Sequence, residues 1–409
     1  MQIMDADVII AGAGPAGAIA ACVLASSGVS VLVIEKALFP RYKVCGGGLT
    51  HKIISEIPLD LGPVIEAPVF SIRFSCGFKE IFTRNSATPM MYCTMRDRLD
   101  KFILDEAVQK GAVVRFEEQV TGVTQDAAGV KVETSKGTYH ARLLIGAEGA
   151  SGTVSRAIGL RDHIMQGLAW EAELKPPPGF LEKFGSTVFL DWGTFPGGYG
   201  WIFPKKDHIS VGVGGPATLS KGMMPYYERF LASAGITTDI SKAGELAFSE
   251  TLSLKSWPIP VRVKKTQFHK GNIMIAGDAA GLTDPLTGEG IYYAVRSGKL
   301  AAKACIDHLS GDSGAMAAYT RSVNDELMNE LTEANRIKAI FNMMPGTIHN
   351  WVKTSDRAWG AFGKILRGER FYADVRSGFG TLRFFWGLSC WFAGIVSRIK
   401  ENRYVKRNY

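Results

Sequence analysis

Glycines and one acidic residue near the start of the chain have the spacing of a dinucleotide-binding turn. The apolar residues 8–11 lead into a Gly-x-Gly-x-x-Gly pattern formed by Gly12, Gly14 and Gly17. In such a turn the first glycine permits the bend, the second lets the backbone approach a pyrophosphate, and the third lets helix and strand pack closely. Glu35 follows the next apolar run, where a carboxylate accepts hydrogen bonds from ribose hydroxyls. We therefore predict a bound dinucleotide, the alternative being a turn that serves packing alone.

Two strands and a helix must hold these residues in place. Residues 8–11 and 31–34 are short apolar runs, as buried parallel strands are. Between them, an alanine-rich segment that includes Ala16 predicts a helix beginning at the glycines. The N-terminus of that helix offers free N–H groups and a partial positive charge to phosphates. We therefore predict that Ala16 contacts the cofactor together with the glycines.

A second glycine-rich segment lies much later in the chain. Residues 272–276 predict another buried strand, and after it come Gly277 and Asp278, then Gly288, Gly290 and Ile291. The nucleotide site is thus divided between the N-terminus and residue 278, whereas a dehydrogenase usually places its nucleotide-binding domain in one stretch. The alternative interpretation is a strand capped by Asp278 and followed by a Pro/Gly turn.

Together these segments resemble the two FAD motifs of the glutathione-reductase-type flavoproteins, in their hydroxylase-like branch. The resemblance implies that Gly277 and Asp278 belong to the FAD site, with Asp278 binding a ribityl hydroxyl. It also implies that the helix start at Gly288, Gly290 and Ile291 lies beside the pyrimidine edge of the flavin. A helix N-terminus there stabilises the negative charge of the reduced ring. FAD is accordingly the predicted cofactor.

Three other positions bear on the same resemblance. It implies that Arg96 reaches the FAD and that the backbone of Val120 meets the adenine, although Arg96 read by itself is equally an ordinary surface arginine. Glu148 stands where the family usually has the aspartate of an Asp-Gly motif, so a role there in binding a nicotinamide cofactor is left open. No second Gly-x-Gly-x-x-Gly exists in the sequence, and we expect no separate NAD(P)H domain. The external reductant, NAD(P)H or a ferredoxin-type donor, is not identified.

The loop after the first nucleotide motif narrows the resemblance to the geranylgeranyl reductase family. Residues 39–49 look like the cysteine-glycine loop of that family. Gly46 and Gly48 would let this loop lie flat against the flavin, with Cys45 near the ring. The alternative for Cys45 is a small buried residue without a chemical role.

An aromatic segment later in the chain points to the same family. Tyr199, Trp201 and Phe203 match the family's aromatic motif, which helps to form a channel for an isoprenoid chain. Alternate residues of a strand share one face, so these three side chains can line one wall together. The alternative is the aromatic core of a sheet.

The order of the predicted elements gives an α/β fold with three parts. We predict a discontinuous Rossmann-like FAD-binding domain over residues 1–165 and 266–310, with short insertions at 51–95. A β-rich substrate-binding domain occupies residues 166–265, and a helical region occupies 311–409. The chain has 409 residues, which is enough for two or three domains with shared interfaces.

Composition and charge limit the partners. The six cysteines are scattered without a Cys/His cluster, which predicts no metal site and suits a reducing cytoplasm. The formal charge of +8 is diffuse and comes with no recognition motif, so we predict no nucleic-acid partner. The chain enters its first strand at once, so we expect no signal peptide.

The end of the chain combines basic and aromatic residues. The aromatic run 384–396 is shorter than the roughly 20 residues that span a bilayer. It predicts either a buried core helix or an interfacial helix, and in the second case residues 382–409 would contact the inner face of the membrane peripherally. Solubility alone is the alternative explanation of the charge.

These inferences combine into a predicted function. We expect an FAD-dependent reductase that saturates C=C bonds of a geranylgeranyl or polyprenyl chain on a lipid, a diphosphate or a related isoprenoid. Cys45 and Tyr199 are the candidate catalytic residues, and Tyr199, Trp201 and Phe203 are the candidate substrate contacts. The partners would be the isoprenoid and an electron-donor protein. The alternatives are electron transfer to a quinone and aromatic monooxygenation.

Overall fold

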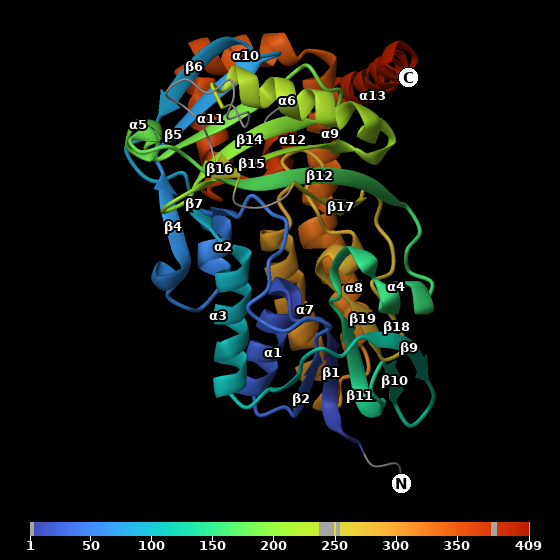
Figure 1. The fold of residues 1–409 in the computed structure, drawn as a ribbon. Helices are drawn as coiled ribbons and strands as arrows, with labels where there is room; N and C mark the ends of the chain where they lie inside the picture. The colour runs from blue at the N-terminus through green and yellow to red at the C-terminus, as the bar shows by residue number, and fades with distance from the viewer. Residues whose placement is uncertain (1–3, 237–248, 251–253, 378–382, 409) are drawn as a thin grey trace.

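The computed structural model describes residues 4–236, 249–250, 254–377 and 383–408. Within these residues the strands form two large sheets and one small sheet (Figure 1). In Figure 1 the first large sheet lies in the lower half of the molecule, near the N-terminus. The second crosses the upper half, where most of the C-terminal helices also lie.

The first sheet carries the glycine-rich turn. Its strands are β1 (Ala6–Ala11), β2 (Val31–Ile34), β8 (Val113–Arg115), β9 (Val120–Gln125), β10 (Val130–Thr134), β11 (Thr138–Gly146), β18 (His269–Lys270) and β19 (Ile273–Ile275). The strand order is β18-β19-β11-β1-β2-β8; in addition, β10 pairs with β11, and β9 pairs with β10. The central strands β19, β11, β1, β2 and β8 run parallel, which explains why β1 and β2 are apolar and buried almost throughout. The late strand β19 therefore returns to the first sheet, as predicted.

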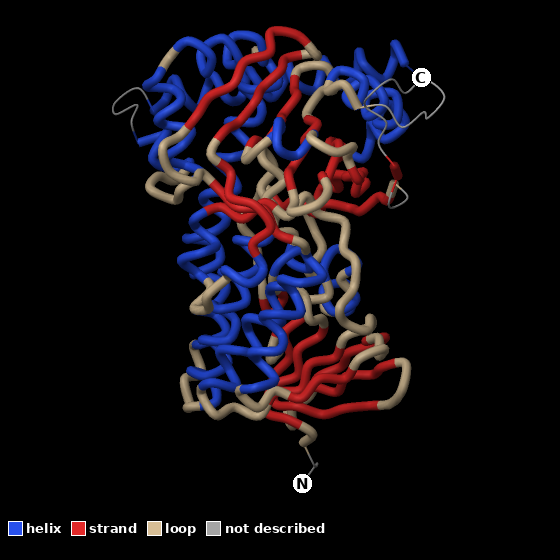
Figure 2. The backbone as a smooth tube through the Cα atoms, turned by 60° about the vertical axis from the view of Figure 1, so that its left-hand side comes forward, coloured by secondary structure: helices blue, strands red, loops and turns tan. Residues whose placement is uncertain are grey.

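Three long helices pack in this half of the molecule. They are α1 (Pro15–Ser26), α3 (Arg96–Gln109) and α7 (Ile291–Leu309), and they lie side by side in Figure 1. Figure 2 shows the helices gathered on one side of the strands in the lower half. The helix α1 follows the glycine-rich turn directly, and most of its small side chains are buried, so it can approach both neighbours closely.

The second sheet is mostly antiparallel. Its strands are β5 (Ser71–Cys76), β6 (Lys79–Asn85), β12 (Ile164–Lys175), β13 (Thr187–Trp192), β14 (Tyr199–Pro204), β15 (Ile209–Pro216), β16 (Ser249–Glu250) and β17 (Lys255–Arg262). The order is β16-β12-β15-β14-β13-β5-β6, and β17 pairs with β12. Part of the predicted β-rich stretch, residues 237–248 and 251–253, lies outside the described residues. The strands β13, β14 and β15 lie within the stretch 166–265 that the sequence predicts to be β-rich.

Residues 51–95 differ from the prediction of short insertions in the first domain. The strands β5 and β6 join the second sheet instead, because β5 pairs in parallel with β13. That pairing joins segments that are distant in the sequence, so no local pattern predicts it. The rest of the stretch forms the small sheet β3-β7-β4 and short helical pieces. Their bounds are β3 (Gly48–Thr50), α2 (His51–Glu56), β4 (Ile65–Val69) and β7 (Met91–Thr94), with a 3₁₀ turn at Gly62–Val64.

Helices cover the second sheet and complete the chain. Within the sheet regions, α5 (Phe180–Phe184) and α6 (Met223–Ser233) belong to the second sheet's part of the chain, whereas α4 (Thr153–Ala157) packs on β9 and β11 of the first sheet. The C-terminal part consists of α8 (Ala315–Ser322), a π-helical segment Val323–Met328, α9 (Asn329–Met343), α10 (Pro345–Thr354), α11 (Asp356–Leu366), α12 (Tyr372–Ser377) and α13 (Arg383–Asn408). The helix α10 packs on β5 and β6, and α13 packs on α9. In the region 311–409, the described residues are mostly helical.

The C-terminal aromatic run lies in α13. The side chains of residues 384–388 and 391 lie outside the described residues. Among the others, Cys390 and Ala393 are buried, whereas Phe392 is 56% exposed and Ile395 38% exposed. One face of this helix is therefore packed and another faces outward. Among the described residues, none of the helices combines the length and the apolar character needed to cross a bilayer.

Candidate active site

A cavity of about 1900 Å³ lies between the two large sheets. Its lining begins at Gly12 and Glu35 of the first sheet, passes Cys45 and Asp278, and continues along Trp201 of the second sheet. Ligand pockets for single small molecules typically enclose about 300–1,000 Å³. The cavity therefore has room for a dinucleotide and a second ligand.

The first glycine motif shapes one end of the cavity. Gly12 has a φ of +98°, and a Cβ there would lie 2.5 Å from the carbonyl oxygen of Ala147, so only glycine fits. Gly14 is open by contrast, since a Cβ there would meet only the Arg41 guanidinium, at 4.0 Å. Gly14 and Ala16 line the cavity where α1 begins, and Gly17 is buried in the first turn of that helix. The helix N-terminus thus faces an open space large enough for phosphates.

Glu35 is positioned by the backbone of the same turn. Its Oε2 accepts a hydrogen bond from Ala13 N at 2.7 Å, and its Oε1 accepts one from Ala37 N at 3.0 Å. Glu35 is 6% exposed and lines the cavity. An ionised carboxylate has about four lone-pair sites, so acceptor capacity is left for ribose hydroxyls.

Arg41 is a cavity residue that the sequence analysis did not single out. Its Nη2 donates to Asp100 Oδ2 at 2.8 Å, while its Nη1 is buried and has no hydrogen-bond partner. A buried guanidinium donor left unpaired beside a helix N-terminus fits an anionic pyrophosphate. The site therefore fits FAD. A lone arginine carries no spacing signal, which is why the sequence did not reveal it.

Arg96 is held by the same carboxylate. Its Nε and Nη2 donate to the two oxygens of the buried Asp100, at 2.7 and 2.8 Å, and its side chain also hydrogen-bonds Cys45. Arg96 lines the cavity at the start of α3, so it is not an ordinary surface arginine. Val120, at the start of β9, is buried and lines the cavity as well.

Glu148, the departure from the Asp-Gly motif, turns back toward the protein. Its Oε1 accepts a hydrogen bond from Val154 N at 2.6 Å, in the first turn of α4. Its Oε2 is buried without a partner, and burial raises the pKa of this carboxyl. Glu148 therefore secures the turn after β11 while it lines the cavity.

The loop that contains Cys45 is pressed against the second sheet. A Cβ on Gly46 would lie 2.8 Å from the ring of Phe203 and 3.0 Å from Trp201 Nε1, so the loop approaches the aromatic strand as only glycine allows. Lys205, just after β14, donates to the carbonyl oxygens of Gly46 at 2.7 Å and of Thr94 at 2.9 Å. Gly48 begins β3 and lines the cavity with Cys45 and Gly46. Lys205 is thus a buried cation that fixes this loop.

The aromatic strand β14 forms a wall of the cavity. Tyr199, Trp201 and Phe203 alternate along β14 and all line the cavity, as expected from their spacing. The ring centroids of Tyr199 and Trp201 are 5.6 Å apart. The Tyr199 hydroxyl donates to the carbonyl oxygen of Thr287, so the hydrogen of this candidate catalytic residue is engaged with the second glycine motif.

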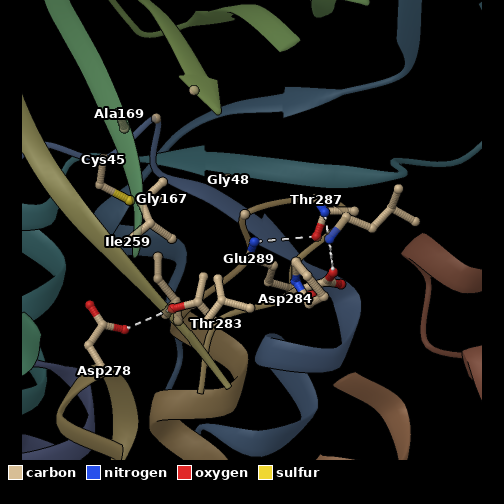
Figure 3. A pocket seen from close by; sticks show the side chains of 18 of the residues that line it. Cys45, Gly48, Gly167, Ala169, Ile259, Asp278, Thr283, Asp284, Thr287 and Glu289 are labelled. Carbon is tan, nitrogen blue, oxygen red and sulfur yellow. Dashed lines mark hydrogen bonds between the residues drawn. The ribbon is translucent and has the colours of Figure 1, made fainter. Parts of the chain in front are cut away.

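The second glycine motif closes the cavity from the first sheet's side. Asp278 Oδ1 accepts a hydrogen bond from the Thr283 hydroxyl at 3.3 Å (Figure 3). Gly277 precedes it in a 3₁₀ turn, Gly277–Ala280, while Gly288, Gly290 and Ile291 line the cavity at the start of α7. Figure 3 shows Cys45, Asp278, Thr283 and Glu289 around this part of the cavity. Both motifs therefore meet in one space, although all strands of the second sheet lie between them in the sequence.

The far end of the cavity is apolar. Its walls come from the second sheet and from the C-terminal helices, with Ile72, Phe74, Leu190 and Trp192 on the sheet and Phe341, Ile348, Trp351, Phe362 and Leu366 on α9, α10 and α11. Trp351 is 57% exposed. These helices carry no recognisable motif, so their share in the cavity could not be predicted.

Comparisons with known proteins identify an FAD-binding domain and related reductases. A family model described as an FAD-binding domain matches residues 5–176. The chain is 31% identical to menaquinone reductase of Mycolicibacterium smegmatis over 320 residues, which cover 73% of this chain and 76% of that protein. It is 29% identical to the chloroplastic geranylgeranyl diphosphate reductase of rice, Oryza sativa subsp. japonica, over 353 residues, with 81% and 71% of the two chains covered.

A solved structure shares the fold. It is that of a geranylgeranyl bacteriochlorophyll reductase-like protein from Thermoplasma acidophilum, with a TM-score of 0.74 and 23% sequence identity. The match covers 92% of this chain and 99% of the other, so the similarity includes both sheets and helices of the C-terminal part.

Proposed function

Because the chain belongs to the geranylgeranyl reductase family of FAD-dependent oxidoreductases, we propose that its substrate is a geranylgeranyl or related polyprenyl chain. The chain would be carried on a lipid, a diphosphate or a related isoprenoid, and C=C bonds in it would be saturated. The observation that carries this proposal is the continuity of one cavity from the glycine motifs to the apolar end around Phe74 and Phe341. Each methylene buried there would contribute about 0.8 kcal/mol.

The residues that would hold FAD are those of the two motifs and their neighbours. They are Gly12, Gly14, Ala16, Gly17, Glu35, Arg41, Cys45, Gly46, Gly48, Arg96, Val120, Gly277, Asp278, Gly288, Gly290 and Ile291. The first sheet with its three long helices would form the FAD-binding domain, and the second sheet with the C-terminal helices would hold the substrate. FAD, when bound and reduced, supplies a hydride to one alkene carbon.

The chain's own side chains would orient the alkene and exclude water. Trp201 and Phe203 lie against the Cys45 loop, so an isoprenoid held along β14 would pass close to Cys45. Tyr199 would hold the second glycine motif against β14 through its hydrogen bond to the carbonyl oxygen of Thr287. We propose Cys45 and Tyr199 as the residues that border the reacting alkene.

The C-terminal helix would bring the protein to the membrane where such substrates reside. Phe392, Ile395 and Ile399 lie outward on α13, and the neighbouring Arg403 is exposed as well. Gly394 and Arg398 of the same helix line the cavity, so its lining reaches the helix that would touch the lipid. We propose peripheral contact of α13 with an anionic membrane surface, from the cytoplasmic side.

Reduction of a quinone is the second candidate, since three similar proteins are named menaquinone reductase. A quinone has a polar ring and an isoprenoid tail, so the apolar end of the cavity would suit it too. The external electron donor, a protein or NAD(P)H, is open in either case.

A binding series tests the proposed substrate. Prenyl diphosphates of increasing length are titrated into the oxidised protein, with tryptophan fluorescence as the readout. Burial of methylenes predicts that the Kd falls at least about tenfold per added isoprene unit until the cavity is full. Phe341→Ser should remove part of that gain, whereas Ile81→Ser, an exposed residue on β6, should not. A Kd that is independent of chain length would contradict the proposal.

A further inference from the structure

Two buried glutamates lie side by side behind the Cys45 loop, and nothing so far accounts for them. Glu171 and Glu173 are on β12, where residues two apart point to the same face. Glu171 is 0% exposed and Glu173 is 3% exposed. Burying a carboxylate in this way is costly, and a second carboxylate on the same face adds to that cost for Glu171.

The Glu171 carboxyl joins this pair to the cavity. Its Oε1 accepts a hydrogen bond from Cys45 N at 2.8 Å and one from the Tyr42 hydroxyl at 3.4 Å, whereas its Oε2 is buried without a partner. Tyr42 and Cys45 both line the cavity. Figure 3 shows Cys45 together with Ala169, which precedes Glu171 on the same face of β12.

Glu173 joins the pair to the surface. His208 Nε2 lies 3.2 Å from Glu173 Oε2, and His208 Nδ1 lies 2.7 Å from Asp207 Oδ1. The Asp207 side chain is 84% exposed, and that of His208 is 19% exposed. Ionisable side chains therefore follow one another from solvent to the cavity, in the order Asp207, His208, Glu173, Glu171 and Tyr42.

We propose that these residues form a proton path, and that Tyr42 delivers the proton of the reduction at its inner end. This rests on the proposed function, in which the alkene receives one hydrogen as hydride from reduced flavin and the other as a proton. At the inner end the Tyr42 O–H bond breaks while a C–H bond forms. The tyrosine oxygen then takes the proton of Glu171, which is replaced from solvent through His208 and Glu173. The product gains two hydrogens, and the two electrons come from the flavin.

Charges around the path set its pH dependence. Burial, with the negative charge of Glu173, raises the pKa of Glu171 to about 7, although Cys45 N, Lys205 and Ser210 act in the other direction. Burial and the two glutamates raise the pKa of Tyr42, so its hydroxyl stays protonated. Burial lowers the pKa of His208, but Glu173 and Asp207 outweigh it and raise the value overall.

Groups from the neighbouring strands complete these surroundings. On β17, Lys255 pairs with Glu171 in register and lies 4.5 Å above the Tyr42 ring. On β15, Ser210 and Gly212 are the residues opposite Glu173 and Glu171. Since Glu171 must carry a proton to pass one on, the proton transfer should be fast below about pH 7 and slow above it.

Single-turnover kinetics of the purified flavoprotein test the path. Reduced protein is mixed anaerobically with geranylgeranyl diphosphate between pH 5.5 and 8.5, and flavin reoxidation is followed. We expect Tyr42→Phe and Glu171→Gln each to slow the step at least about 100-fold, as loss of a general acid does. Glu171→Gln should also abolish the decline above pH 7. Glu330→Gln, which alters another buried carboxyl, is the control and should retain both rate and pH profile. Wild-type rates in Tyr42→Phe or Glu171→Gln would overturn the proposal.

Infrared spectroscopy gives a readout that needs no turnover. A protonated carboxyl band that disappears with a midpoint near pH 7 is expected in the oxidised wild-type protein and absent in Glu171→Gln. His208→Gln, which is nearer the surface, should leave this band in place while slowing reprotonation in repeated turnovers. Absence of the band in the wild type, or its persistence in Glu171→Gln, would overturn the path. If no prenyl substrate reoxidises the wild-type flavin, the proposed function fails, and the band still decides whether Glu171 holds a proton.

Discussion

Arg41 shows how a single side chain can indicate what a site binds. One of its guanidinium nitrogens is satisfied by Asp100, and another is buried without a partner beside the N-terminus of α1. An unpaired buried donor of this kind costs free energy unless a ligand accepts from it. The pyrophosphate of FAD carries oxygens that would accept a hydrogen bond from this donor.

Replacing Arg41 should therefore weaken the binding of FAD. We expect Arg41→Ala to raise the Kd for FAD at least about tenfold, because a charge-assisted hydrogen bond contributes about 1.5–3 kcal/mol. The measurement is a titration of flavin-free protein with FAD, followed by quenching of flavin fluorescence. Arg84→Ala is the control, because Arg84 lies on β6 of the second sheet and pairs there with Asp356. An unchanged Kd in Arg41→Ala would mean that the guanidinium does not face the cofactor.

Among single residues, those whose spacing is regular could be predicted from the sequence, and those whose role depends on the fold could not. The glycines, Glu35 and Asp278 are recognisable because a strand, a turn and a helix must follow one another in the chain. Arg41, Lys205 and Glu171 have no such spacing. They come together only when the Cys45 loop docks on the second sheet.

At the scale of elements, the close crossing of α1 and α7 holds the two glycine motifs together. A Cβ on Gly298 of α7 would lie 2.3 Å from the carbonyl oxygen of Ala16 on α1. That atom belongs to the backbone, so it cannot move aside without moving the first motif.

Two glycine substitutions distinguish the effect of this close crossing on stability from the effect of helix propensity. Gly298→Ala should lower the free energy of unfolding by at least about 2 kcal/mol, since the clash exceeds the gain of up to about 1 kcal/mol from replacing glycine in a helix. Gly360→Ala in α11, where a Cβ meets nothing within 4 Å, should leave stability unchanged or raise it slightly. Urea unfolding of both variants checks this. Equal effects of the two substitutions would count against a tight crossing.

The exposed face of α13 should govern membrane binding. Replacing Phe392, Ile395 and Ile399 together by serine removes apolar side chains that are between 38% and 56% exposed. We expect the fraction of this variant that sediments with anionic vesicles to be several-fold lower than that of the wild type. High salt should also weaken the binding of the wild-type protein to the vesicles. Ile81→Ser on β6, also an exposed apolar residue, serves as the control. Equal sedimentation of all three proteins would argue against contact through α13.

Elements were predictable where their pattern is local and unpredictable where pairing is distant. The strand at residues 31–34 and the return of residues 273–275 to the first sheet follow from short apolar runs. The helix α3 begins at Arg96, a little earlier than its apolar positions indicate. The transfer of β5 and β6 to the second sheet depends on β13, which lies about a hundred residues away, so local sequence could not reveal it.

At the scale of the whole molecule, the division of the chain into two sheets creates the cavity. The first sheet contributes the glycine motifs, the second contributes an aromatic wall, and the C-terminal helices close the apolar end. The chain leaves the first sheet after β11 and returns to it at β18, and β14 lies on the excursion between them. The apolar end was beyond sequence prediction because the helices that close it carry no motif and are placed by packing alone.

We propose that this cavity holds an isoprenoid against the flavin so that a C=C bond is reduced. The most direct measurement is anaerobic. The bound flavin is reduced with dithionite, a geranylgeranylated lipid or diphosphate is added, and flavin reoxidation is followed alongside mass spectrometry of the product. We expect reoxidation together with a gain of about two mass units per turnover, the mass of the two hydrogens added to one C=C bond. Reoxidation by menaquinone or oxygen but by no prenyl substrate, with unchanged substrate mass, would contradict it.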